Sequence, residues 1–132
     1  MKTKFLLLSF ILILFSCISM PIRPDHPVSI KSLGELSRIE ISSWVYSIWF
    51  YSDSPEKSYD LAMYWAADVG IVDQFLTFTI DYKDLVSYPL GKYGLHLVVR
   101  MHRENQPYSY NCEVIASRVC YKYNIDTDNP LK

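Results

Sequence analysis

Glycine and net charge are both scarce in this sequence. Four of its 132 residues are glycine, and 13 basic side chains balance 14 acidic ones to leave a formal net charge of −1. A nearly neutral chain lacks the basic surface that neutralises a phosphate backbone, so we expect no nucleic-acid partner. Aromatic residues are plentiful instead, with 11 tyrosines and 3 tryptophans. A tyrosine-rich, glycine-poor composition is typical of a compact antiparallel sheet protein.

Long apolar runs are also absent after the N-terminus. The run at residues 5–15 is interrupted by Ser9 alone and follows Lys2 and Lys4. A basic start followed by an apolar stretch shorter than the roughly 20 residues that cross a bilayer is typical of a secretory signal. We therefore predict an export signal peptide in residues 1–19, with a short membrane anchor or a buried helix as the alternatives.

Two processing routes are open for this signal. The sequence Leu14-Phe15-Ser16-Cys17 resembles a bacterial lipobox, in which case Cys17 would bear a lipid that anchors the protein in a membrane. The rival cut falls after Ser19 and would release the protein. Residues 20–37, with prolines at positions 21, 24 and 27, would form a proline-rich leader. We expect the protein to be secreted or to lie at the cell surface or envelope.

Cysteine is rare, which limits the disulfides that the chain can form. Only Cys112 and Cys120 lie beyond the predicted signal. In an oxidising compartment we expect them to form a disulfide across a β-hairpin that turns near residues 115–117. The alternative is a pair of buried thiols in one strand. No Asn-x-Ser/Thr sequence occurs, which argues against a glycosylated eukaryotic surface protein.

Alternation of apolar and polar residues predicts β-strands through most of residues 38–124. Residues 38–51 are too many for one average strand, so we expect two segments with a bend or bulge near residues 42–43 or at Ser47. Aromatics on both faces of this run predict that part of it is covered on both sides. After a polar turn at residues 52–57, residues 59–67 and 75–80 alternate again and predict two further strands. A helix in residues 59–67 would leave no separate polar stripe, which favours the strand, and residues 81–88 are expected to hold a short helical turn.

The clearest strand is predicted at residues 91–101. A Pro-Leu-Gly turn at residues 89–91 leads into it. Its odd-numbered residues are expected to face the core: Tyr93, Leu95, Leu97, Val99 and Met101. A last pair of strands is predicted at residues 108–114 and 119–123. The fold class we expect is therefore all-β, an antiparallel β-sandwich of about six or seven strands over residues 38–124, followed by a polar tail in residues 125–132.

Two segments carry a resemblance to a known family. Residues 60–66 are Asp-Leu-Ala-Met-Tyr-Trp-Ala, residues 91–98 are Gly-Lys-Tyr-Gly-Leu-His-Leu-Val, and the aromatic Tyr51 precedes both. From Tyr51 to Val99 this pattern is similar to the GBS Bsp-like repeat, an immunoglobulin-like module of bacterial surface and wall-associated proteins. The resemblance implies an immunoglobulin-like β-sandwich and a non-catalytic surface module, and it supplies no catalytic residue.

Three polar residues on the clearest strand form the candidate binding face. His96, Arg100 and His102 would share one side of the strand, where alternate positions are about 7 Å apart. They could form a partly cationic patch for a carboxylate or for sugar hydroxyls, with a charge that rises as the pH falls toward about 6. The alternative is a solvated sheet face with structural histidines. A metal site would need a third ligand, and His26 lies in the predicted leader, so we expect no metal.

A second candidate site is an aromatic platform. Seven aromatic residues could supply a stacking platform for sugars, because exposed aromatic rings combine apolar area with a polar group: Trp44, Trp49, Trp65, Tyr46, Tyr51, Tyr59 and Tyr64. Of these, Tyr59, Tyr64 and Trp65 are our candidate platform. Most other aromatics must fill the core of so small a domain. Tyr93 is expected to be a corner tyrosine whose hydroxyl binds the backbone, as in immunoglobulin-like sandwiches.

No catalytic arrangement is visible in the sequence. No serine has the flanking glycines of a nucleophile elbow, and the acidic residues are scattered over turns. We therefore expect an exported, non-catalytic binding module without a cofactor that recognises a wall glycan or a protein partner through one sheet face. Two alternatives stay open: a secreted viral or host-directed immunoglobulin-like accessory protein that acts by protein–protein contact, and a periplasmic enzyme inhibitor or immunity protein that uses residues 52–57. The sequence leaves the oligomeric state open.

Overall fold

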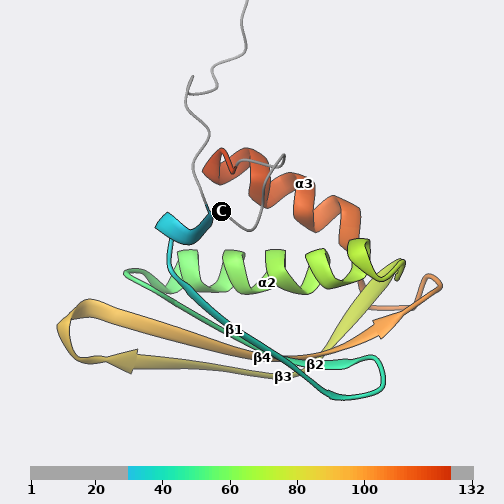
Figure 1. Ribbon diagram of the computed structural model, residues 1–132, viewed down its shortest axis with the longest axis horizontal. Coiled ribbons are helices and arrows are strands. Elements are labelled where there is room, and N and C mark those ends of the chain that lie inside the picture. The colour runs from blue at the N-terminus through green and yellow to red at the C-terminus, as the bar shows by residue number, and fades with distance from the viewer. Residues whose placement is uncertain (1–29, 126–132) are drawn as a thin grey trace, which may run out of the picture.

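A computed structural model describes residues 30–125 as one open antiparallel sheet with two helices packed on one of its faces (Figure 1). The elements in chain order are η1 (Ile30–Ser32), β1 (Glu35–Ser42), β2 (Val45–Ser52), α2 (Pro55–Val72), β3 (Thr77–Tyr88), η2 (Pro89–Gly91), β4 (Lys92–His102), β5 (Tyr110–Asn111) and α3 (Cys112–Tyr123). The predicted all-β immunoglobulin-like sandwich is therefore wrong, because a single sheet and two helices form the domain.

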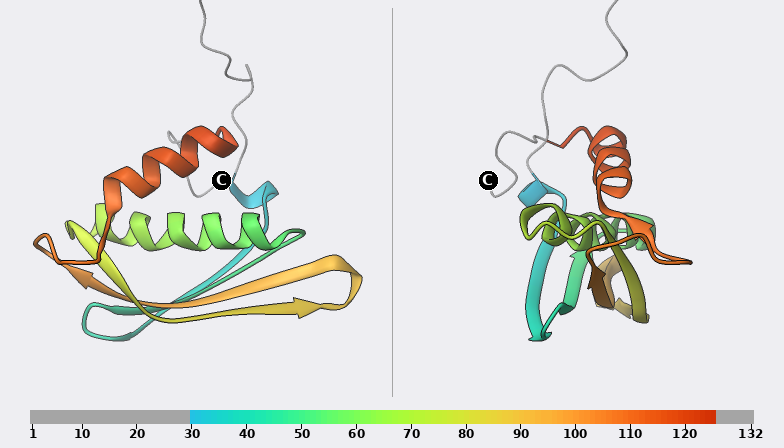
Figure 2. Two further views of the ribbon diagram at one scale, coloured as in Figure 1. Left: turned by 180° about the vertical axis from the view of Figure 1, so that it is seen from behind. Right: turned by 90° about the vertical axis from the view of Figure 1, so that its right-hand side faces the viewer.

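The sheet has the strand order β1-β2-β4-β3-β5, and every neighbouring pair is antiparallel. β2 and β3 lie on either side of β4, and α2 connects them across the sheet (Figure 2). α3 packs mainly on α2 rather than on the sheet. We refer to the sheet face under α2 as the inner face and to the opposite one as the outer face, on which no described helix lies (Figure 1).

β4 is the central strand, and its inner side chains form the middle of the core. Leu95 is 2% exposed, and Leu97, Val99 and Met101 are fully buried. The predicted strand and the burial of four of its five odd-numbered residues are confirmed, whereas Tyr93 is only half-buried. Since successive side chains alternate between faces, the even-numbered residues of β4 lie on the outer face.

α2 begins with strong capping residues. Ser54 is the N-cap, and its side chain accepts a hydrogen bond of 3.0 Å from the backbone N–H of Lys57. Pro55 occupies the first turn, where its missing N–H costs nothing, and Glu56 places negative charge at the positive end of the helix dipole. The strand predicted for residues 59–67 is wrong because these residues belong to an 18-residue helix.

α2 lacks a polar stripe because it is covered on two sides, by the sheet and by α3 (Figure 1). Its buried residues are Ser58, Leu61, Ala62, Met63, Tyr64, Trp65, Ala66, Ala67, Val69 and Gly70. A helix that is buried nearly all round does not separate polar from apolar positions. The missing stripe therefore indicated burial rather than a strand.

α3 replaces the hairpin predicted from residues 108–114 and 119–123. Asn111 is its N-cap and accepts a hydrogen bond of 3.1 Å from the Val114 N–H, and Asn124 ends it in the left-handed conformation with φ 51°. Its buried residues are Cys112, Ile115, Ala116, Val119 and Cys120. They recur at spacings of three and four residues, which is the period of a helix. The predicted hairpin is wrong because the helical spacing of these residues was interpreted as the two-residue alternation of strands.

The predicted disulfide between Cys112 and Cys120 is wrong, since both are buried thiols that form no disulfide. Both residues lie on α3, eight positions apart, which separates them by about 12 Å along the helix axis. A disulfide needs its two Cα atoms within about 7 Å. Burial raises the pKa of Cys112 to about 11, so this thiol stays protonated at neutral pH.

The two strand segments predicted for residues 38–51 are confirmed as β1 and β2, which turn between Ser42 and Val45, with Trp44 at φ 65°. The helical turn predicted for residues 81–88 is wrong. A β-bulge between Ile80 and Tyr82 lets β3 continue to its end before the η2 turn.

Several predictions concern residues outside 30–125. The signal peptide of residues 1–19, the lipidation of Cys17 and nearly all of the polar tail lie outside the described residues. β1 begins at Glu35, inside the predicted leader of residues 20–37. Within the described part of the chain, neither helix is long and apolar enough to cross a membrane.

Candidate functional site

The outer face of the sheet carries a group of rings from β2, β3 and β4. The register places Trp49 opposite His96, and places Tyr82 and Tyr88 opposite other outer residues of β4. We refer to this group as the aromatic cluster, which consists of Trp49, Tyr51, Tyr82, Tyr88 and His96. Tyr82 is 50% exposed and Tyr88 is 39% exposed, so the cluster reaches solvent.

Three rings of the aromatic cluster lie almost parallel. Trp49 stacks on His96 with centroids 4.3 Å apart, and on Tyr51 with centroids 5.8 Å apart, both at an interplanar angle of 7°. The Tyr82 ring meets the His96 ring edge to face with centroids 5.4 Å apart, and the ring centroids of Tyr88 and Tyr51 are 5.9 Å apart. Such ring pairs each contribute about 0.5–1.5 kcal/mol beyond area burial. The cluster is therefore a preorganised surface that its own contacts stabilise.

Gly94 creates the space that two of these rings occupy. A Cβ atom at this position would lie 2.9 Å from Cε1 of Tyr51 and 3.0 Å from Cε2 of Tyr88. Gly94 lies on the outer side of β4, between β2 and β3, so the rings cover it from both neighbouring strands. A glycine inside a strand often marks such a close approach.

The predicted binding residues all lie on the outer side of β4, and each contacts a neighbouring side chain. His96 Nε2 is 2.8 Å from Ser47 Oγ, Arg100 Nη2 is 3.0 Å from Asp81 Oδ2, and His102 Nε2 is 2.9 Å from Thr79 Oγ1. The Asp81 carboxylate balances the Arg100 charge, so this surface is less cationic than the sequence indicated. His96 belongs to the aromatic cluster, whereas Arg100 and His102 lie farther along the strand.

His96 is expected to make the stability of the protein depend on pH. Burial lowers the pKa of His96 from its usual 6.5, and the Asp84 carboxylate partly opposes this effect. The unfolded chain therefore takes up a proton at a higher pH than the folded protein does. The free energy of unfolding should fall as the pH decreases through about 6.5 and level off below the pKa of the folded state. Thermal unfolding at a series of pH values, together with NMR titration of the ring, measures both effects.

The control for this prediction is the other outer-face histidine. His96→Gln keeps a hydrogen-bonding group beside Ser47 and should remove this part of the pH dependence. His102→Gln should leave it in place, because this histidine lies outside the aromatic cluster. A His96 ring that titrates at or above its usual 6.5 would contradict the prediction.

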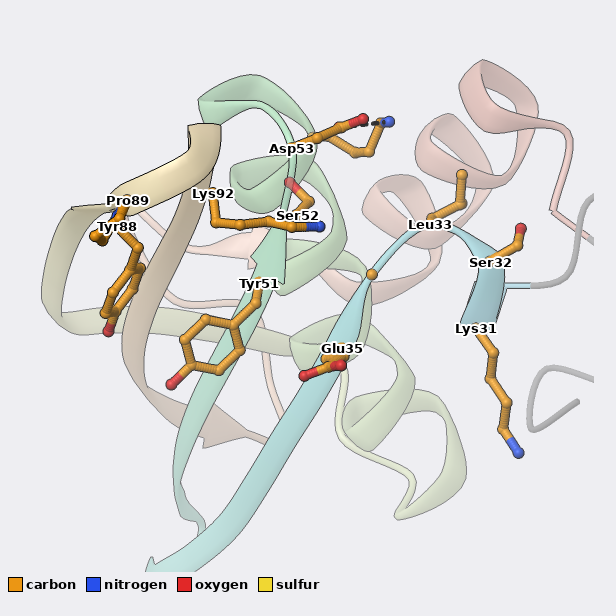
Figure 3. Close-up of a pocket in the computed structure, with 12 residues that line it drawn as sticks. Lys31, Ser32, Leu33, Glu35, Tyr51, Ser52, Asp53, Tyr88, Pro89 and Lys92 are labelled. Carbon is orange, nitrogen blue, oxygen red and sulfur yellow. Dashed lines mark hydrogen bonds and ion pairs between the residues drawn. The ribbon is translucent and has the colours of Figure 1, made fainter.

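A pocket of about 540 Å³ adjoins the aromatic cluster at one end of the sheet. Its volume is in the range of small-molecule sites. The lining comes from η1, the start of β1, the end of β2, the first turn of α2, the end of β3 and the η2 turn with the start of β4 (Figure 3). Tyr51 and Tyr88 belong to both the pocket and the aromatic cluster, so the two features form one continuous surface.

Charged side chains surround the tyrosines of this pocket. Lys92 extends across it from β4, and Glu35 lies beside Tyr51 (Figure 3). The Lys57 ammonium is held by Asp53 at 2.8 Å, whereas Lys92 forms no ion pair with any residue in the range 30–125. The pocket therefore contains an ammonium group that is available to an anionic ligand.

The hydroxyl of Tyr51 is a hydrogen-bond donor at neutral pH. Burial raises the pKa of Tyr51, and the neighbouring Tyr88 and Glu35 raise it further. Lys31, the third lysine of the lining, points away from the two tyrosines (Figure 3). The part of the pocket next to the aromatic cluster thus combines two tyrosines, the Lys92 ammonium and the Glu35 carboxylate.

The predicted platform of Tyr59, Tyr64 and Trp65 does not form an exposed surface, since Tyr59 is half-buried and the other two are buried. All three residues are in α2, where Tyr64 and Trp65 are each 4% exposed and Tyr59 packs against the core. Lys83 Nζ lies 5.0 Å from the centre of the Tyr59 ring, and the Arg38 guanidinium lies 5.3 Å from the centre of the Trp65 ring. These side chains are therefore unavailable for stacking on a sugar.

Ser47 Oγ and His96 Nε2 are 2.8 Å apart, which is the distance expected between the serine and the histidine of a serine-hydrolase triad. Asp84 lies opposite His96 in the register, yet within residues 30–125 it makes no hydrogen bond to the imidazole. β2 pairs with β1 on one side and with β4 on the other, so the backbone N–H groups around Ser47 are used in the sheet and form no oxyanion hole. Nor do the described residues contain three His, Cys, Asp or Glu side chains that could hold a metal ion.

Comparisons of the chain with protein-family models, with curated proteins and with solved structures found no match. The resemblance to the GBS Bsp-like repeat stays a prediction, and the immunoglobulin-like sandwich that it implies differs from the open sheet observed. The function must therefore be argued from the geometry of the outer face.

Trp49 and Tyr51 were considered for the predicted platform but assigned to the core, and Tyr82 and Tyr88 were not considered for it. Trp49 and Tyr51 alternate with buried side chains of β2, and aromatics on both faces of this strand do not mean that both faces are covered. Tyr82 and Tyr88 fall in the segment predicted as a helical turn. Gly94 was the available signal, because a glycine in the middle of a clear strand indicates that a bulky neighbour lies over it.

Proposed function

We propose that this chain is a non-enzymatic binding protein whose ligand is a surface or cell-wall glycan that carries a carboxylate. The observation that carries the proposal is the continuity of the aromatic cluster with the pocket through Tyr51 and Tyr88. Ligand sites in proteins combine aromatic and apolar surface with a few well-placed polar groups. Export belongs to the same proposal and rests on the predicted signal in residues 1–19.

The side chains of the pocket support this choice of ligand. The Lys92 ammonium suits a carboxylate, because a hydrogen bond between two charged groups is stronger than one between neutral groups. The Glu35 carboxylate and the Tyr51 hydroxyl can bind sugar hydroxyls, as an acceptor and as a donor. The rings of the aromatic cluster supply apolar area next to these groups.

Binding experiments with purified peptidoglycan, glucuronate and uncharged glucose test the proposal. We expect peptidoglycan to retain the protein, and glucuronate to bind more tightly than glucose. Tyr88→Ala should weaken binding by about tenfold, which corresponds to about 1.4 kcal/mol. Lys92→Gln should remove the preference for glucuronate over glucose and leave binding of glucose unchanged.

Matched controls on the same molecule separate the site from general effects. Tyr121→Ala removes a tyrosine of α3 that is 70% exposed, and Lys31→Gln removes the lysine that points away from the tyrosines. Neither variant should change binding. Absence of binding to peptidoglycan and to both sugars would refute the glycan ligand. If the wild-type chain retains another protein and the Tyr88→Ala variant does not, the outer face would be assigned to a protein partner instead.

A further inference from the structure

β1 is an open edge of the sheet. Within residues 30–125 it pairs with β2 on one side, and no strand lies along its other side. Seven of its eight residues are exposed, and Ile39 and Ile41 are 62% and 56% exposed. An uncovered strand edge presents unpaired N–H and C=O groups that can pair with another strand. β-branched side chains such as isoleucine favour that pairing.

The opposite edge of the sheet is protected against such pairing. β5 covers the first two residues of β3, and a bulge follows after Ile80. The strand then carries Asp81, Lys83 and Asp84 along its free edge. Short covering strands, bulges and charges are the means by which edge strands resist association. In β1 the bulge comes only after Glu40, so the strand is regular over its first six residues.

The sequence of β1 is complementary to itself about Ile39. Arg38 and Glu40 flank Ile39 and share the inner side of the sheet, while Ile39 lies on the outer side. In an antiparallel pair of two β1 strands centred on Ile39, each Arg38 would lie opposite Glu40 of the second copy. Opposite charges directly across a strand pair stabilise it, and like charges destabilise it. A pair centred on Arg38 or on Glu40 would place like charges opposite each other.

We infer that β1 pairs with β1 of a second copy of this chain, in an antiparallel register centred on Ile39. The two five-stranded sheets then form one continuous sheet. Directly opposed residues of an antiparallel pair lie on the same face, so both helical layers lie on one side and both outer faces on the other. Two aromatic clusters would therefore face the same way. With both clusters on one side, the dimer could bind a repeating glycan at two points. This bivalent binding rests on the proposed function, whereas the dimer does not depend on it.

A cysteine at the centre of the register tests the pairing directly. In Ile39→Cys, the two new side chains would have Cβ atoms about 4.5–5.5 Å apart, and an added oxidant should link the two chains. In Ser37→Cys, on the same face of the same strand, the two new side chains would be about 14 Å apart along the strands, and no link should form. The wild-type protein under the same oxidant gives the background from the cysteines already present in the chain.

A charge reversal tests the same register through affinity. Sedimentation equilibrium should show a dimer for the wild-type protein. Glu40→Lys should raise its dissociation constant by roughly tenfold, because Arg38, which also pairs with Asp68 of its own chain at 3.3 Å, then faces a lysine. Glu35→Lys makes the same charge change at the end of the strand, opposite no residue of the partner strand, and should leave the dissociation constant of the dimer unchanged. A monomeric wild type, a cross-link in Ser37→Cys in place of Ile39→Cys, or equal dissociation constants for Glu40→Lys and Glu35→Lys would each overturn the inference.

Discussion

Phe78→Ala is expected to lower the free energy of unfolding by about 4 kcal/mol. Phe78 is fully buried on the inner face of β3, between Met101 of β4 and Tyr110 of β5 in the register, and its ring lies 5.4 Å from that of Tyr110. Truncation removes apolar contacts and leaves a cavity at the junction where β5 joins the sheet. Domains of this size are stable by about 5–15 kcal/mol, so the loss would be a large part of the total.

Urea unfolding followed by circular dichroism measures this effect. Leu85→Ala is the matched control, because Leu85 lies on the same strand beyond the bulge and is 48% exposed. Its truncation should cost less than about 1 kcal/mol. Similar losses for the two variants would mean that β3 is not divided into a buried first part and an exposed second part.

β4 could be predicted from the sequence because its two faces differ. Leu95, Leu97 and Val99 pack under α2, while His96 and Arg100 lie on the outer face, and this contrast produces a clean two-residue period. β2 was predicted as the continuation of the run in residues 38–51, although its two faces differ less, because Trp49 and Tyr51 lie on the outer face. Strands covered on one side are therefore the part of this fold that periodicity alone identifies.

The two helices could not be predicted from periodicity alone. α2 is covered by the sheet and by α3, so its apolar residues surround the helix and their order in the sequence resembles alternation. The informative signal lies before the apolar run, in Ser54-Pro55-Glu56, which has the residue types of an N-cap, a first helical position and an acidic first turn. Asn111 and Glu113 give a similar signal at the start of α3.

The candidate site was predicted only in part. His96 could be placed on an outer sheet face because it alternates with core residues of its own strand. The pocket depends on elements far apart in the sequence, since η1 and β1 meet the η2 turn only when β4 lies between β2 and β3. Strand order is a tertiary property, and no local pattern around Tyr51, Tyr88 or Lys92 specifies it.

Gly70→Ala is expected to lower the free energy of unfolding by about 2 kcal/mol, although the same change in an exposed helix would raise it by about 1 kcal/mol. Gly70 lies in the last turn of α2, where its backbone is helical, and faces α3. A Cβ atom there would lie 2.2 Å from Sγ of Cys112 and 3.1 Å from Cε of Met101. Because Cys112 is only 1% exposed, its sulfur has little room to move, and the two helices would have to separate.

A double-mutant cycle isolates the cause of this effect. Cys112→Ala removes the sulfur atom that the new methyl group would meet, and Gly70→Ala should then cost about 1–2 kcal/mol less than it does in the wild type. The new Cβ atom would still lie 3.0 Å from the Cβ atom of residue 112. A small shift of the helix can relieve this contact. Chemical unfolding of the four proteins gives the coupling energy. A stabilising effect of Gly70→Ala in the wild type would mean that α3 does not approach α2 at this glycine. The close contact between the two helices would then be absent, and the burial of α2 on its second side would need another explanation.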